Sequence, residues 1–106
     1  MSAASNDPGI TDVPAENRFV FRENDALAEL VYELNGTRLT LIHTGVPEAL
    51  GGRGIGGRLV RASIARGARE GLTIVPWCPF ARSWLKEHPD AARGVTIDFE
   101  TPPPRT

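Results

Sequence analysis

The sequence contains a single cysteine, a single tyrosine and no apolar run near the roughly 18 residues that a membrane-spanning helix needs. One thiol, Cys78, can neither form an intramolecular disulfide nor supply a thiolate cluster, so we expect a reducing, cytoplasmic compartment and no metal. The first residues lack the basic and apolar regions of a secretory signal, so export is not expected. Acidic and basic side chains nearly cancel, with 13 Asp and Glu against 12 Lys and Arg. The chain therefore has no overall charge that would draw it onto nucleic acid or an anionic membrane.

The remaining composition is that of one ordinary globular domain. The chain has 106 residues, of which 41% are hydrophobic and 24% are charged. Residues 1–17 are rich in Ser, Ala, Asn, Asp, Pro and Gly without an apolar period, and we interpret them as a flexible leader. Residues 100–106 contain three consecutive prolines and are interpreted as a flexible tail. The predicted domain spans residues 18–99.

The first half of this domain has the period of antiparallel strands. Asn35-Gly36 is typical of a two-residue type I′ hairpin turn, and pairing outward from it sets Tyr32 opposite Leu39 and Leu30 opposite Leu41. One face of the hairpin then collects apolar side chains, as a half-buried sheet requires. A shorter strand over residues 18–22 precedes it across a turn at residues 23–25.

The second half has a helical period. The pattern predicts a helix over residues 58–70 that ends near Gly71, then a short buried strand over residues 72–75 parallel to the strand before the helix. A second helix is expected over residues 79–87, burying Phe80, Trp84 and Leu85, with a weak edge strand over residues 95–99. The fold class is therefore α/β (α+β), a mixed and mostly antiparallel sheet with two helices.

The glycine-dense segment from Gly51 to Gly57 lies just ahead of the first helix. Backbone N–H groups that turn into a helix N-terminus form an array of donors that suits a pyrophosphate. The alternative is a turn that needs glycine only for its φ angles. The chain is too short for a Rossmann sheet, and the segment lacks the Lys-Ser/Thr of a Walker loop.

Four blocks occur in an order and spacing that resemble a known family. They are His43-Thr-Gly-Val-Pro47, Gly52-Arg-Gly-Ile-Gly56, Val75-Pro-Trp-Cys-Pro-Phe80 and His88-Pro89. Over about residues 18–95 they resemble the small stand-alone YjdJ-type N-acetyltransferase domain of the GNAT superfamily. The resemblance implies a reduced GNAT-like fold, acetyl-CoA as co-substrate and transfer of an acetyl group to an amine of a small molecule or protein. It also implies that the pantetheine lies between two splayed parallel strands and that the coenzyme is bound by Val46, Gly52, Arg53, Gly54, Ile55, Gly56, Gly57 and Arg58.

The chain departs from the superfamily pattern at two places. GNAT proteins commonly have Arg or Gln three residues before the first motif glycine, where this chain has Gly51. Full-size GNAT domains also carry two helices between their first strands, whereas here only the turn at residues 23–25 is available. A non-catalytic acyl-CoA-binding or protein-interaction module is therefore the alternative function.

Two side chains are candidates for catalysis. Cys78 follows the second parallel strand near a helix N-terminus, which stabilises a thiolate, so it could accept the acetyl group as a thioester. Its alternative role is that of a small buried hydrophobe. His43 shares the strand parity of Leu39 and Leu41, so we expect it on their face, either as a base or as a core histidine bonded to backbone. His88 is interpreted as a helix cap.

The first helix carries several arginines but no interleaved aromatic residues, so we interpret its charge as a solvated face and expect no nucleic-acid partner. The expected partners are acetyl-CoA and an unidentified amine acceptor, with no membrane partner. The chain is expected to be a monomer or a weak homodimer.

Overall fold

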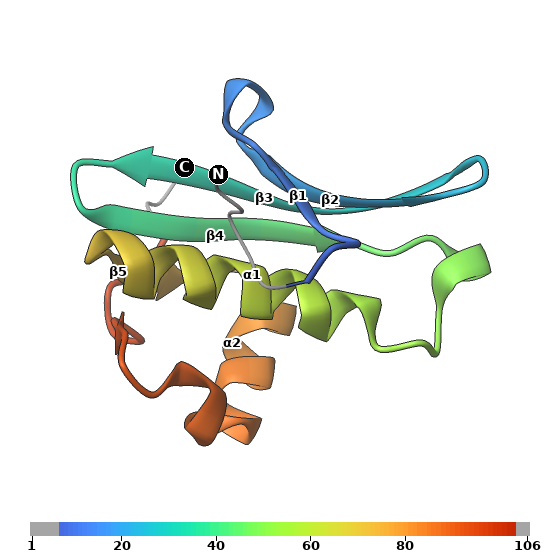
Figure 1. Ribbon diagram of the computed structural model, residues 1–106. Helices are drawn as coiled ribbons and strands as arrows, with labels where there is room; N and C mark the ends of the chain where they lie inside the picture. The colour runs from blue at the N-terminus through green and yellow to red at the C-terminus, as the bar shows by residue number, and fades with distance from the viewer. Residues whose placement is uncertain (1–6, 104–106) are drawn as a thin grey trace.

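A computed structural model describes residues 7–103, in which six strands form one sheet whose spatial order follows the chain (Figure 1). The first four strands pair antiparallel, and the last two add in parallel. The strands are β1 (Thr11–Val13), β2 (Arg18–Glu23), β3 (Ala26–Asn35), β4 (Arg38–Gly45), β5 (Thr73–Pro76) and β6 (Thr96–Ile97). The helices are α1 (Ile55–Glu70) and α2 (Pro79–Glu87), with short 3-10 turns at Pro14–Glu16, Glu48–Leu50 and Pro89–Ala92. The predicted mixed, mostly antiparallel sheet with two helices is confirmed.

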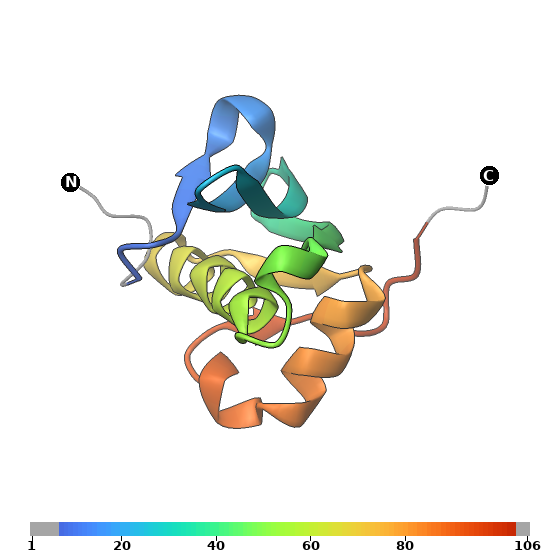
Figure 2. The ribbon, with the colours of Figure 1, turned by 90° about the vertical axis from the view of Figure 1, so that its right-hand side faces the viewer.

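The core lies between one face of the sheet and α1. Alternate residues of the central strands, such as Phe19, Leu30 and Leu39, are completely buried, and they meet Leu59 and Val60 of α1. The helix runs lengthwise along the sheet, in nearly the same direction as β4 (Figure 1), and α2 packs beside it (Figure 2). No helix among residues 7–103 is long and apolar enough to span a membrane.

The hairpin between β3 and β4 differs from the prediction by its turn. Gly36 and Thr37 form the two-residue loop, and Gly36 has a φ of +62° at the first loop position, where type II′ turns place glycine. Asn35 therefore pairs with Arg38, and Tyr32 lies opposite Leu41 rather than Leu39. The shift is an even number of residues, so the predicted apolar face is kept although the predicted partners are wrong.

A β-bulge in β4 changes which side chains face the core. Tyr32 pairs with Leu41, but the preceding Val31 pairs with His43, so Ile42 is an extra residue on β4. One extra residue exchanges the two faces of the strand beyond it. His43 consequently lies on the face opposite Leu41 and is exposed, while Thr44 takes the core-side position. The prediction that His43 shares the face of Leu39 and Leu41 is wrong for this reason.

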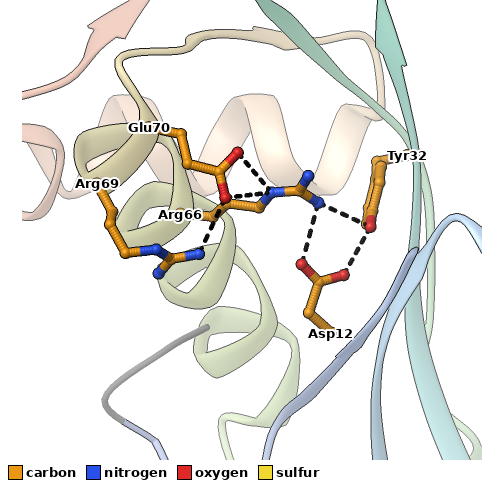
Figure 3. Close-up of polar contacts among 5 residues, drawn as sticks. All are labelled: Asp12, Tyr32, Arg66, Arg69 and Glu70. Atoms are coloured by element: carbon orange, nitrogen blue, oxygen red, sulfur yellow. Dashed lines mark hydrogen bonds and ion pairs between the residues drawn. The ribbon is translucent and has the colours of Figure 1, made fainter. Parts of the chain in front are cut away.

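Part of the segment assigned to a leader belongs to the domain. Ile10 is buried in the core, and β1 pairs with β2 along its whole length. The Asp12 carboxylate accepts hydrogen bonds from the Tyr32 hydroxyl at 2.6 Å and from the Arg66 guanidinium at 3.0 Å, and Arg66 also donates to Glu70 (Figure 3). The boundary at residue 17 is therefore placed too late, because these partners are distant in sequence. Residues 1–6 of the predicted leader lie outside the described residues.

The other predicted elements are close to those observed. Gly71 ends α1 with a φ of +69°, as expected, and His88 caps α2 by placing its Nδ1 2.8 Å from the Trp84 carbonyl oxygen. Leu85 is buried as predicted, but Phe80 is 43% exposed, which contradicts the expectation of a core residue. Past β6, the Asp98 carboxylate accepts hydrogen bonds from the backbone N–H groups of residues 100 and 101, so the start of the predicted tail is tied to the domain. Residues 104–106 lie outside the described part of the chain.

Candidate active site

The segment between β4 and α1 takes its shape from glycine conformation. Gly52 and Gly54 both have a φ of +74°, and a Cβ at either position would meet no atom within 4 Å. Because the space is open, the left-handed backbone and not a close contact accounts for these two glycines. Gly54 is the residue that caps the N-terminus of α1.

The first amides of α1 have no side-chain cap. The first intrahelical bond runs from the Arg58 N–H to the Gly54 carbonyl at 3.1 Å, so the preceding N–H groups of the first turn lack an intrahelical acceptor. Within residues 7–103 no side chain caps this terminus. Gly51, by contrast, donates its N–H to the Glu48 carbonyl at 3.0 Å. The loop therefore presents free donors at the positive end of the helix macrodipole.

These donors border an open pocket of about 420 Å³. It is lined by Val46, Leu50, Gly51, Gly52, Gly54, Ile55, Gly56, Gly57, Phe80 and Trp84. Val46 and Phe80 are 37% and 43% exposed, so the pocket has apolar walls beside its polar end. A hollow of about 500 Å³ elsewhere has no lining from the glycine loop, and it is lined by Asp7, Pro8, Arg61, Ala62, Ile64, Ala65 and Ala91.

Gly56 and Gly57 have a packing reason that sequence reasoning missed. A Cβ on Gly56 would lie 2.7 Å from the Phe80 ring, and one on Gly57 would lie 2.5 Å from Trp84 Nε1. The two glycines thus allow α2 to approach the first turn of α1. The signal in the sequence was the combination of two adjacent glycines in one helix and two aromatic residues four positions apart in the next.

Arg53 and Arg58, the two predicted phosphate ligands, are paired with carboxylates of the chain. Arg53 makes two hydrogen bonds to Glu23 at 2.7 and 2.8 Å, and Arg58 makes two to Asp7 at 2.6 and 2.7 Å. The hydrogen bonds from the arginines lower the pKa of the Glu23 and Asp7 carboxyls. Most of the residues predicted to bind the coenzyme therefore line one pocket, but the Arg53 and Arg58 side chains do not.

The strands β4 and β5 separate directly beyond their last parallel pair, Leu41 with Pro76. The Leu41 carbonyl accepts hydrogen bonds from the N–H groups of both Trp77 and Cys78, at 3.0 and 2.9 Å. Beyond this point β4 continues to Gly45, whereas the other strand turns into α2. The predicted divergence of the two strands therefore begins at Leu41, and side chains bridge the gap between them.

Cys78 lies at this divergence, where it is the N-cap residue of α2. It is 3% exposed, and its Sγ lies 3.2 Å from the Thr44 Oγ1 across the gap. Thr44 was missed by sequence reasoning because only the bulge at Ile42 turns it toward the core side. His43 occupies the opposite face, so the structure does not bring the two predicted catalytic residues together.

A family model described as GCN5-related N-acetyltransferase matches residues 18–94. The chain belongs to this family. A solved relative is the solution structure of a GCN5-like candidate N-acetyltransferase from Staphylococcus aureus, which is 27% identical. The match covers 86% of this chain and 91% of that one, with a TM-score of 0.65. No protein with a curated description matches the chain. This N-acetyltransferase therefore has the GNAT fold at reduced size, and the family generally uses acetyl-CoA and an amine acceptor.

Proposed function

We propose that this N-acetyltransferase binds acetyl-CoA in the pocket beside the glycine loop and transfers the acetyl group to an amine. The observation that carries the proposal is the set of N–H groups at the start of α1, because they border an open pocket and no side chain among residues 7–103 caps them. Amides at a helix N-terminus are suited to a diphosphate.

The chemistry of the residues around the pocket suits the coenzyme. The backbone N–H groups of residues 52–57 would donate hydrogen bonds to the diphosphate, and the exposed apolar side chains of Val46 and Phe80 would contact the pantetheine. Bound acetyl-CoA supplies an activated acetyl thioester. The backbone N–H of Val46, just past β4, would polarise the thioester carbonyl. Gly51 provides no side chain for a further phosphate contact.

Two routes of acetyl transfer are compatible with the arrangement. In direct transfer, the deprotonated acceptor amine attacks the thioester carbonyl while backbone donors hold the oxyanion. The tetrahedral intermediate then breaks its C–S bond, coenzyme A leaves as the thiolate, and the proton lost by the amine goes to that thiolate or to water. In a relay, the Cys78 thiolate attacks the thioester carbonyl and the coenzyme A thiolate leaves. The amine then attacks the acetyl-cysteine, the Cys78 thiolate leaves, and the amine gives up its extra proton to a released thiolate or to water. The position of Cys78 at the strand divergence supports the relay, whereas its burial against Thr44 requires that contact to open first.

Ligand-dependent stability tests the binding step. Acetyl-CoA should raise the melting temperature in a concentration-dependent manner, because a ligand that binds only the folded state stabilises it by mass action. S-Acetylpantetheine, which keeps the acetyl thioester but lacks the diphosphate, supplies the matched control. An unchanged melting temperature at millimolar acetyl-CoA would refute coenzyme binding. A shift without turnover on a panel of amines would instead favour a non-catalytic acyl-CoA-binding module.

Intact mass spectrometry separates the two routes. Incubation with acetyl-CoA should add one acetyl group to the wild-type chain and none to Cys78→Ala if the relay operates. Unimpaired turnover by Cys78→Ala, with no acetylated wild-type protein, would exclude the relay and leave direct transfer. Cys78→Ser is the conservative comparison, because it keeps the side-chain volume close to that of cysteine.

A further inference from the structure

Arg53 is the exception within the glycine loop. It is the only residue from 51 to 54 that has a side chain, and it lies between Gly52 and Gly54, which both adopt the left-handed conformation. All other residues from 50 to 57 line the pocket, but Arg53 does not. Its guanidinium instead points to Glu23, with which it makes two hydrogen bonds.

Glu23 provides a fixed anchor for this contact. It is the last residue of β2 and pairs with Ala26 across the two-residue turn formed by Asn24 and Asp25. Asn24 has a φ of +55°, so the turn has a defined backbone conformation. A two-bond contact between guanidinium and carboxylate also fixes the relative orientation of the two groups more strictly than a single hydrogen bond does.

We propose that the Glu23–Arg53 ion pair is a clasp that holds the glycine loop in its coenzyme-binding conformation, so that both residues are positioning residues and Arg53 is not itself a phosphate ligand. The inference rests on the proposed function, since it concerns binding at the same site. A glycine-rich loop loses more backbone entropy on ordering than other segments. A side-chain tether that orders the loop in the free protein reduces this loss when the ligand binds.

Calorimetric titration with coenzyme A tests the clasp in four variants. Glu23→Gln and Arg53→Gln should each weaken binding by a similar factor of about five, and the double variant should be no weaker than either one, because the two residues act as a unit. The exchanged pair Glu23→Arg/Arg53→Glu should restore most of the affinity. Tighter binding by Glu23→Gln, or a loss confined to Arg53→Gln, would overturn the proposal, because it would show that Arg53 binds the phosphates directly.

A measurement on the free protein separates this inference from the proposed function. The {¹H}–¹⁵N nuclear Overhauser effects of the Gly51, Gly52 and Gly54 amides should fall in Glu23→Gln, since these values report backbone order on the nanosecond timescale. The matched control is Asp90→Asn, which removes another exposed ion pair, that with Arg93. Unchanged values in Glu23→Gln would overturn the clasp even if the wild-type chain failed to bind coenzyme A.

Discussion

Replacing Asp12 by alanine should be among the most destabilising changes outside the apolar core. The Asp12 and Arg66 side chains are only 7% and 10% exposed, and they are joined at 3.0 Å (Figure 3). Removing one partner of a buried ion pair costs about 3–5 kcal/mol, because the other charge remains buried. Glu70 still contacts the Arg66 guanidinium, which lowers this cost, whereas the Tyr32 hydroxyl loses its acceptor. We therefore expect a loss of about 3 kcal/mol in the free energy of unfolding.

Urea denaturation followed by tryptophan fluorescence measures this loss. The probes are Trp77 and Trp84, which are distant in sequence from Asp12. The double variant Asp12→Leu/Arg66→Met should recover part of the stability, because no charge is then left buried. Asp90→Ala, which breaks an exposed pair, is the control and should have no measurable effect. A loss below about 1 kcal/mol for Asp12→Ala would refute the reasoning, since it would mean that Arg66 reaches solvent without its partner.

Three further predictions concern single residues. Burial and the neighbouring Asp12 raise the pKa of Tyr32 from 10.0 to about 12, so the stability that the protonated Tyr32 hydroxyl contributes is complete below pH 10 and is lost as the pH rises toward 12. Tyrosinate absorbance reports only Tyr32, the single tyrosine, and should stay low at pH 10; half-ionisation of the folded protein at that pH would contradict the raised pKa. Gly51→Arg should strengthen coenzyme A binding about tenfold by adding a phosphate contact. The backbone dihedral angles there (φ −69°, ψ 156°) suit any residue, and the new Cβ would lie 3.3 Å from the Glu48 carbonyl oxygen, which a small local shift relieves. Calorimetry should show no gain for Gly51→Met, and equal gains would exclude a charge effect. Gly57→Ala should lower the midpoint of thermal unfolding, because its Cβ would lie 2.5 Å from Trp84 Nε1. Adding Trp84→Phe should restore part of the lost midpoint. An unchanged midpoint in the single variant would contradict the prediction, since it would show that α2 moves away from α1 without cost.

The helices and the glycine loop were predictable because local signals determine them. The apolar period placed α1 and α2, and Gly71 marked the end of the first helix through a conformation that other residues rarely adopt. The four sequence blocks likewise indicated the family that the comparisons show. The helix signals lie within short stretches of chain, and the family signal is the order of four short blocks along the chain, so no tertiary contact was needed to interpret any of them.

The predicted roles of side chains were less complete, because a role depends on what lies opposite. Phe80 has a core-like spacing in α2, yet it stands exposed at the pocket because the first turn of α1 ends beside it. Arg53 has the charge of a phosphate ligand, but Glu23, thirty positions earlier, holds it. The residues next to Phe80 and Arg53 in the sequence do not indicate these tertiary neighbours.

By itself, the sequence determined the fold class, both helices, the location of the glycine loop and the family. Tertiary structure alone decided that Ile42 bulges out of β4, and it thereby decided that Thr44 rather than His43 meets Cys78. It also decided that the strand around Asp12 belongs to the sheet, since Tyr32 and Arg66 supply its partners. The physical reason is common to these cases: strand register and buried charge pairing are set by residues far apart in the chain, and they leave no periodic trace in either segment.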